Sequence, residues 1–328
     1  MRCKRSHFLT QHALHVVTAQ EKFRRNGKTV DREGVAALAG AMIGRRGVPL
    51  IEDQVGVFER CTMFLGDGEQ GWKALKSPCP DVEMKLKYFP PKKGERTIAT
   101  GKATALIDTS AEEAAAWVFE FCSNNRMRIN REEGHPTRLE LREKRRVNES
   151  TMASVKRFPF LIDNREFVVR QIWKSEEGGK VWVAFESVDE KVDYGVPLRA
   201  ARAFTQGCYY FENLADKYGA HQCKAQLAQH FDIKGNIPAW VVNSKVPTVL
   251  NVLQEACDEF RQDEAIDSAL AKEFHTTLTA WKGEEYSEED DALLQRVCDK
   301  FEESLNAEDQ KERRRSSFLF KREQAGWR

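Results

Sequence analysis

The sequence lacks the features that define several large classes of protein. Its eight cysteines include no CxxC motif, and no two are closer than Cys208 and Cys223. This spacing fits neither a disulfide framework nor a zinc ribbon, and it favours a reducing, intracellular setting. No apolar run approaches the roughly 18 residues that would span a bilayer, and the N-terminus has no short apolar block typical of a secretory signal. We therefore expect a cytoplasmic protein.

Signatures of catalysis and of nucleic-acid binding are also missing. Lys and Arg number 52 against 51 Asp and Glu, so no charge excess points to a nucleic-acid partner. The sequence has no GxSxG, HExxH or GxxxxGK[ST] motif. His221 and Cys223 share one face of a predicted strand, but no further ligand pair accompanies them. The sequence predicts no catalytic residue, no metal site and no cofactor.

What is present predicts one main domain with two extensions. The chain of 328 residues with 41% apolar content can bury one large core. Residues 1–70 carry weak helical patterns broken by Gly44, Gly47 and Pro49, and begin with a basic stretch. Residues 71–275 form the predicted domain, and residues 276–328 a helical and basic C-terminal tail. Both extensions are candidate sites for a protein partner.

The order of patterns within the domain predicts an α+β fold. "VEMKLKYF" and "RTIATGKATALID" alternate polar and apolar residues, as a hairpin does. "DTSAEEAAAWVFEFC" switches to a helical period with Ser110 placed to cap it. Seven predicted strands follow without an intervening helix, which favours an antiparallel sheet: 138–147, 152–161, 165–173, 180–187, 197–205, 207–214 and 220–231. A long amphipathic helix is then predicted from Pro247 to Phe260.

Three motifs in one order resemble the START family of lipid-transfer domains. They are "DNREFVVRQIW" at 163–173, "VPLRAARAF" at 196–204 and "DIKGNIPAWVVN" at 232–243. The family pattern is Arg-Asp-Phe-Val, then Val-Arg in a strand, then Asp-x-x-Gly-x-Ile/Leu-Pro before the last helix. Here Glu166 replaces the usual Asp, and Leu198 precedes Arg199. The resemblance covers about Trp72 to Phe260.

The resemblance implies a helix-grip fold, in which a curved antiparallel sheet wraps around a long C-terminal helix and encloses a hydrophobic cavity. It implies binding of a phospholipid or another single lipid, transfer or sensing of that lipid, and transient contact with a membrane surface. Strand alternation places Phe167, Val169, Gln171 and Trp173 on one face, which we expect to line the cavity. Gln171 stands where sterol-binding members tend to carry an arginine, which argues against a cholesterol-like ligand. The other expected lining residues are Trp182, Ala184, Val249, Leu250 and Leu253, with Arg199 as a head-group candidate.

Other interpretations stay open at this stage. The lining residues would look the same if they simply filled a solid core. A regulatory or scaffold module, whose lipid occupancy controls protein interactions, fits the unexplained ends of the chain. Some helix-grip relatives outside START are cyclases or hydrolases, so the fold alone does not exclude an enzyme.

Overall fold

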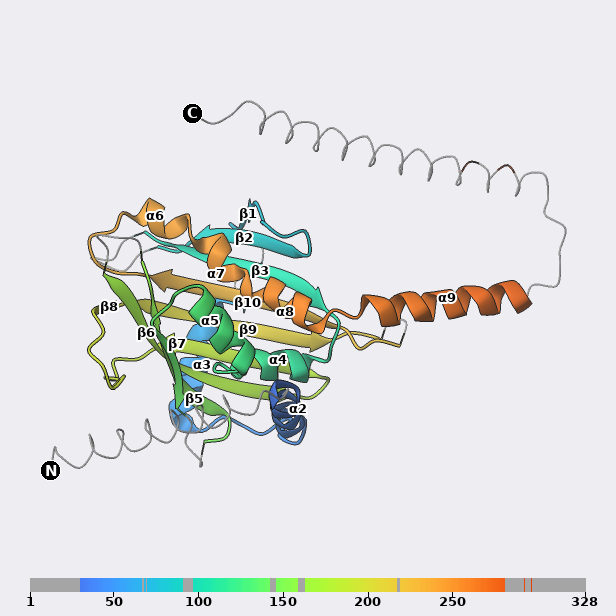
Figure 1. Ribbon diagram of the computed structural model, residues 1–328, viewed down its shortest axis with the longest axis horizontal. Coiled ribbons are helices and arrows are strands. Elements are labelled where there is room, and N and C mark those ends of the chain that lie inside the picture. Colours follow the sequence, from blue (N-terminus) through green and yellow to red (C-terminus); the bar gives the residue numbers. More distant parts are fainter. Residues whose placement is uncertain are drawn as a thin grey trace. The chain divides into compact units, whose positions relative to one another are not determined.

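A computed structural model describes residues 30–66, 68, 70–90, 97–141, 146–158, 163–216, 219–280, 292 and 296. The basic N-terminal stretch and most of the predicted C-terminal tail lie outside these residues. The chain divides into two units, Met1–Ala269 and Leu270–Arg328. The following description concerns the first unit, whose elements are shown in Figure 1.

The centre of this unit is a ten-stranded sheet. Its strand order is β1-β2-β3-β10-β9-β7-β6-β5-β4, and neighbours along this path run antiparallel. The short β8 lies off the path and pairs in parallel with β6. The strands are β1 (Lys73–Leu75), β2 (Val82–Tyr88), β3 (Ala99–Ile107), β4 (Thr137–Leu141), β5 (Glu149–Lys156), β6 (Asn164–Glu176), β7 (Lys180–Ser187), β8 (Ala200–Arg202), β9 (Phe204–Asn213) and β10 (Cys223–Asp232).

Helices precede, interrupt and follow this series of strands, so the predicted α+β class is confirmed (Figure 1). Their bounds are α2 (Val30–Ile43), α3 (Glu52–Gly66), α4 (Ala111–Phe119), α5 (Asn124–Glu132), α6 (Ala239–Asn243), α7 (Val246–Leu250), α8 (Val252–Phe260) and α9 (Asp263–Ala280). Ser110 caps α4 as predicted, because its hydroxyl accepts a hydrogen bond from the backbone N–H of Glu113 at 3.2 Å.

Three local predictions differ from the structure. The predicted strand 197–205 is divided between β8 and β9. Helix α5 was not predicted from the sequence. The predicted long helix is segmented into α7 and α8, which meet at Asn251. The joint between α7 and α8 is contacted by a residue distant in the chain. The thiol of Cys79 lies 3.2 Å from Oδ1 of Asn251.

The two faces of the sheet carry different apolar clusters. One face, here called the inner face, contributes Val169, Trp173, Val183 and Phe185 to the main buried cluster, together with residues of α4, α7 and α8. The opposite, outer face contributes Ile172, Ala184 and Cys208 to a smaller cluster with Val57 and Cys61 of α3. The C-terminal helices therefore lie against the inner face and α3 covers part of the outer face.

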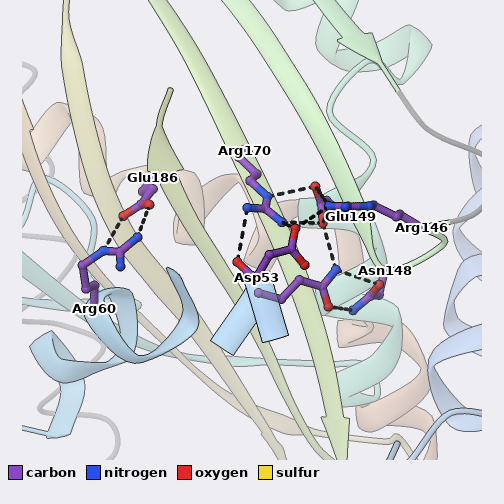
Figure 2. A network of polar contacts seen from close by, with 8 residues as sticks. Asp53, Arg60, Arg146, Asn148, Glu149, Arg170 and Glu186 are labelled. Carbon is purple, nitrogen blue, oxygen red and sulfur yellow. Dashed lines mark hydrogen bonds and ion pairs between the residues drawn. The ribbon is translucent and has the colours of Figure 1, made fainter. Parts of the chain in front are cut away.

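Helix α3 is also joined to the outer face by charged side chains. Asp53 forms ion pairs with Arg146 at 2.8 Å and Arg170 at 3.1 Å, and Arg170 also pairs with Glu149 at 2.8 Å. Arg60 pairs with Glu186 at 2.6 Å (Figure 2). Asp53 and Arg60 belong to α3, whereas their partners belong to the sheet or its connections. Residues 52–66 are thus held to the sheet by packing and by charge.

A second polar cluster holds the segment after α2 against α4. The buried carboxylate of Glu112 accepts hydrogen bonds from the Arg46 guanidinium and from Asn213 Nδ2, the latter at 3.0 Å. Burial raises the pKa of Glu112, but the bonds from Arg46 and Asn213 outweigh it and leave the pKa below its ordinary value. The ionised carboxylate is therefore part of the folded structure.

Replacing Arg46 with glutamine is expected to lower the free energy of unfolding at pH 7 by about 1–2 kcal/mol, because a hydrogen-bonded charge partner is lost. A lowered folded-state pKa contributes stability above the unfolded value, 4.5, and loses it as the pH falls below that value. The difference between wild type and R46Q should therefore shrink below about pH 4.5. Urea unfolding of both proteins at several pH values measures this difference. A difference that stays constant down to pH 3 would contradict the ionised, hydrogen-bonded Glu112 of the folded protein.

Candidate functional site

The predicted lining face of β6 lies on the inner face of the sheet. Val169 and Trp173 are buried in the main cluster, and Phe167 packs against it. Their cross-strand neighbours agree, since Trp173 pairs with Val183 and Gln171 with Phe185. Directly paired residues point to the same side of a sheet. The structure therefore brings the four β6 residues together beneath the helices.

Trp182 and Ala184 do not join this face, and their place in the predicted lining is corrected. In the register of β6 and β7, Trp182 pairs with Lys174 and Ala184 with Ile172. Both belong to the outer-face cluster with α3, where the Trp182 ring lies 6.1 Å from that of Phe58. Alternation within β7 separates them from Val183 and Phe185, and only the register with β6 shows which set points inward.

Gln171 is buried on the inner face, but its amide does not depend on a ligand for partners. Nε2 donates to the carbonyl of Phe119 at 2.9 Å and to the Ser150 hydroxyl at 2.8 Å. The end of α4 supplies the first acceptor and β5 supplies the second. The buried amide nitrogen of Gln171 therefore has two protein acceptors without a bound lipid.

Arg199 is also not brought to the inner face. It is exposed and precedes β8. The arginine that meets Glu166 is Arg202, with Nε 3.0 Å from the carboxylate. Arg199 is thus not brought together with the other predicted residues.

The predicted helix residues lie on the inner face as expected. Leu250 of α7 and Leu253 of α8 are fully buried in the main cluster, and Val249 packs against it. Helix α7 approaches the sheet closely at Gly101 of β3. A Cβ at Gly101 would lie 2.6 Å from Cγ1 of Val246 and 2.9 Å from Cδ1 of Leu250. We call this contact of Gly101, Val246 and Leu250 the lid seam.

Two arginines with buried guanidinium nitrogens, the buried Arg126 and the half-buried Arg138, were not predicted from the sequence. Arg126 of α5 is only 6% exposed, and its guanidinium carbon lies 3.9 Å from the centre of the Trp117 ring. Arg138 of β4 stacks on Phe121 at 3.8 Å. Nε and Nη2 of Arg126 and Nε of Arg138 are buried and have no hydrogen-bond partner among the described residues. Buried cations normally have paired donors, so these unpaired donors mark a site where a ligand could bind.

The pKa shifts indicate that the two guanidinium groups share one apolar environment. Burial lowers the pKa of Arg126, and the negative charge of Glu255 on α8 partly opposes this. Burial, followed by the positive charge of Arg126, lowers the pKa of Arg138 to about 10. Burial raises the pKa of Tyr209 on β9 to about 12, against the influence of Arg126. Glu255 of α8 and Tyr209 of β9 are therefore the titratable neighbours that influence both guanidinium groups.

An acceptor accompanies the unpaired donors. Asn130 lies one helical turn after Arg126 on α5, and its Oδ1 is buried without a partner. We call Arg126, Arg138 and Asn130 the buried polar site. Two guanidinium groups suit a phosphate or carboxylate, which they bind through charge-assisted hydrogen bonds. An apolar surround strengthens such bonds because water does not compete for the donors.

The signal for this site is weak in the sequence. The segment "NNRMRINREE" contains three arginines among polar residues, which is typical of a solvated stretch. Arg128 is such a residue: it is 57% exposed and pairs with Glu132 one turn later. Arg126 differs from Arg128 only in the direction in which α5 presents it. Only the packing of α5 against Trp117 separates the two.

The curved antiparallel sheet and the C-terminal helices on its inner face define a helix-grip domain. Residues 138–262, less than half of the chain, match the family model described as START domain. The resemblance derived from the three motifs is confirmed. START domains bind lipids, and lipid binding is therefore the general function that this match supports.

Solved structures similar to the chain include three human proteins. The lipid transfer and protein localization domain of human StarD13 is 15% identical, covers 65% of this chain and 99% of that chain, and has a TM-score of 0.47. Human STARD10 is 18% identical, with coverage of 74% and 89% and a TM-score of 0.46. Human StAR-related lipid transfer protein 5 is 17% identical, with coverage of 63% and 95% and a TM-score of 0.47. No curated protein matches at the required significance.

No described helix is both long and apolar enough to cross a membrane.

Proposed function

We propose that the protein binds one phospholipid molecule between the inner face of the sheet and helices α7 and α8, and carries it between membranes. The observation that carries the proposal is the set of buried guanidinium nitrogens of Arg126 and Arg138 that have no hydrogen-bond partner among the described residues. Keeping a guanidinium out of water costs several kcal/mol unless it is paired. A lipid phosphate supplies the missing acceptors, and no described carboxylate pairs with either guanidinium within 4.0 Å.

The inner face supports the acyl part of the same proposal. Moving one CH2 group from an apolar environment into water costs about 0.8 kcal/mol, so a 16-carbon chain needs on the order of 12 kcal/mol of shelter. Phe167, Val169 and Trp173 of the sheet and Leu250 and Leu253 of the helices belong to one apolar cluster. Acyl chains that separate these two layers would stay out of water while the phosphate reaches Arg126 and Arg138.

Native mass spectrometry of the purified full chain tests this proposal. We expect one bound lipid per chain, with a mass and a phosphorus content that identify a phospholipid. A protein that carries no lipid and extracts none from phosphatidylcholine vesicles would exclude lipid binding. A bound sterol or ceramide would keep lipid binding but exclude the phosphate assignment.

Movement of labelled phospholipid between donor and acceptor vesicles distinguishes a carrier from a sensor. We expect the protein to accelerate this movement without changing the lipid chemically. Retention of lipid without transfer would support sensing in place of transfer, and chemical change of the lipid would support an enzyme.

A further inference from the structure

The buried polar site contains a hydrogen-bond acceptor that a lipid phosphate cannot satisfy. Asn130 is 3% exposed, and its Oδ1 has no hydrogen-bond partner among the described residues. Such an oxygen needs an N–H or O–H donor, whereas the oxygens of an ionised phosphodiester only accept hydrogen bonds. An acceptor that stays unpaired in an apolar environment costs free energy. The ligand of this site should therefore carry a donor as well as a phosphate.

The connection between α5 and β4 sets the orientation of the Asn130 amide. Nδ2 lies 3.5 Å from the carbonyl oxygen of His135, and the backbone N–H of His135 donates to the Asn130 carbonyl at 3.0 Å. Exchanging the amide oxygen and nitrogen would place Oδ1 against the His135 carbonyl oxygen, so Oδ1 stays on the side away from it. Arg126 lies one turn earlier on the same face of α5. The acceptor is therefore beside a guanidinium group that would bind the phosphate.

A carboxylate accompanies this acceptor. Burial lowers the pKa of Arg126 and Arg138, and the negative charge of Glu255 on α8 partly opposes both shifts. The pKa of Lys156 on β5 is lowered by burial and then by Arg138, again against Glu255. No ion pair within 4.0 Å joins Glu255 to a cation in the described part of the chain. Its charge thus acts on the site without being neutralised by a direct partner.

We propose that the buried polar site selects a phospholipid whose head group ends in a primary ammonium group, as in phosphatidylethanolamine, with Asn130 Oδ1 and the Glu255 carboxylate as its acceptors. The inference rests on the proposed function, because the phosphate of the same lipid would lie on Arg126 and Arg138. An ethylene bridge keeps the ammonium close to the phosphate, as Asn130 is close to Arg126. The trimethylammonium group of phosphatidylcholine has no N–H donor and would leave Asn130 Oδ1 unpaired. Asn130 is therefore the residue that separates the two head groups.

Native mass spectrometry of the full chain after incubation with mixed vesicles tests the proposal. The vesicles contain equal amounts of phosphatidylethanolamine, phosphatidylcholine and phosphatidylglycerol with identical acyl chains, so only the head groups differ. We expect bound phosphatidylethanolamine to exceed bound phosphatidylcholine about tenfold, the effect of one hydrogen bond from a charged group. Phosphatidylglycerol has hydroxyl donors but no positive charge, so it should bind less than phosphatidylethanolamine.

Asn130→Leu should remove this preference without lowering phosphatidylcholine binding. Leucine has a similar volume but no acceptor, so the ratio of bound phosphatidylethanolamine to phosphatidylcholine should fall to about one. A purely structural role of Asn130 would instead lower the binding of both lipids together. Glu255→Gln should also lower the ratio, and Glu255 is exposed, so this variant keeps the core unchanged. Glu264→Gln is the control, because Glu264 is exposed at the start of α9.

The outcomes separate this inference from the proposed function. Equal binding of phosphatidylethanolamine and phosphatidylcholine by wild type overturns the head-group selection and leaves phospholipid binding in place. Phosphatidylglycerol bound as well as phosphatidylethanolamine overturns the ammonium assignment. An equal loss of all three lipids in N130L, or a wild-type ratio in E255Q, also overturns the selection. If N130L does not fold, the ratio in E255Q decides alone. A wild-type chain that binds none of the three phospholipids overturns both this inference and the proposed function.

Discussion

Replacing Arg126 with methionine is expected to lower the amount of phospholipid bound per chain at least tenfold while leaving the protein folded. Hydrogen bonds to a charged group contribute about 1.5–3 kcal/mol each, and two unpaired nitrogens of Arg126 are available to a phosphate. Methionine keeps the apolar contact with Trp117 but has no charge. Phosphorus analysis of lipid extracted from purified R126M, compared with wild type, measures the effect.

The stability of the same variant separates a ligand-binding role from a structural one. Replacing a buried charge with an apolar side chain of similar volume is often neutral or stabilising. R126M without lipid should therefore unfold at the same or a slightly higher urea concentration than lipid-free wild type. Arg128→Met is the matched control on the same helix, because Arg128 is exposed and paired with Glu132. Wild-type phospholipid content in R126M, or an equal loss in R128M, would reject the phosphate site.

Replacing Gly101 with valine is expected to displace α7 from the sheet and to shorten lipid retention. Even a single Cβ at this position would lie 2.6 Å from Val246 and 2.9 Å from Leu250, below any normal contact distance. Overpacking of this kind typically costs 1–3 kcal/mol. The lipid should leave G101V about ten times faster than wild type, because each 1.4 kcal/mol corresponds to a factor of ten. Release of a fluorescent phospholipid into excess vesicles measures the rate.

Two further variants control this prediction. Gly101→Val combined with Leu250→Ala removes one of the two clashing side chains. The double variant should therefore recover part of the lost stability, so the two effects should be non-additive. Gly34→Ala on α2 is a glycine substitution with no atom within 4 Å of the new Cβ. It should stabilise the helix by about 0.5–1 kcal/mol and leave lipid release unchanged. A G101V protein with reduced stability but a wild-type release rate would reject the lid seam as a barrier to release.

Residues of β6 and β7 show how much of the candidate site can be predicted from the sequence. Alternation correctly grouped Phe167, Val169, Gln171 and Trp173 on one face of β6. The same reasoning chose Trp182 and Ala184 on β7, which the strand register places on the outer face with α3. Alternation states that successive residues face opposite sides, but it does not state which side is the inner one. That choice depends on the alignment of two strands and on the helices that cover each face.

In the segment "DIKGNIPAWVVN", too, the sequence predicts one feature and the tertiary structure decides another. Its Gly235 has φ +71° and Pro238 precedes α6, as a rigid turn before the C-terminal helices requires. The exposure of Trp240 within the same motif could not be derived from the pattern, because an apolar residue beside a helix start is usually buried. Only the packing of Val242 against the core orients α6 so that Trp240 faces solvent.

The sequence by itself determined the α+β class, the positions of most strands, the Ser110 cap and the relation to the START family, because these depend on local periodicity, turn residues and ordered motifs. The tertiary structure decided which of two similar arginines is buried, which residues of β7 face inward, where the C-terminal helix is divided and which side of α6 meets solvent. Each of these depends on contacts between segments distant in the chain, and the local amino-acid pattern does not contain that information.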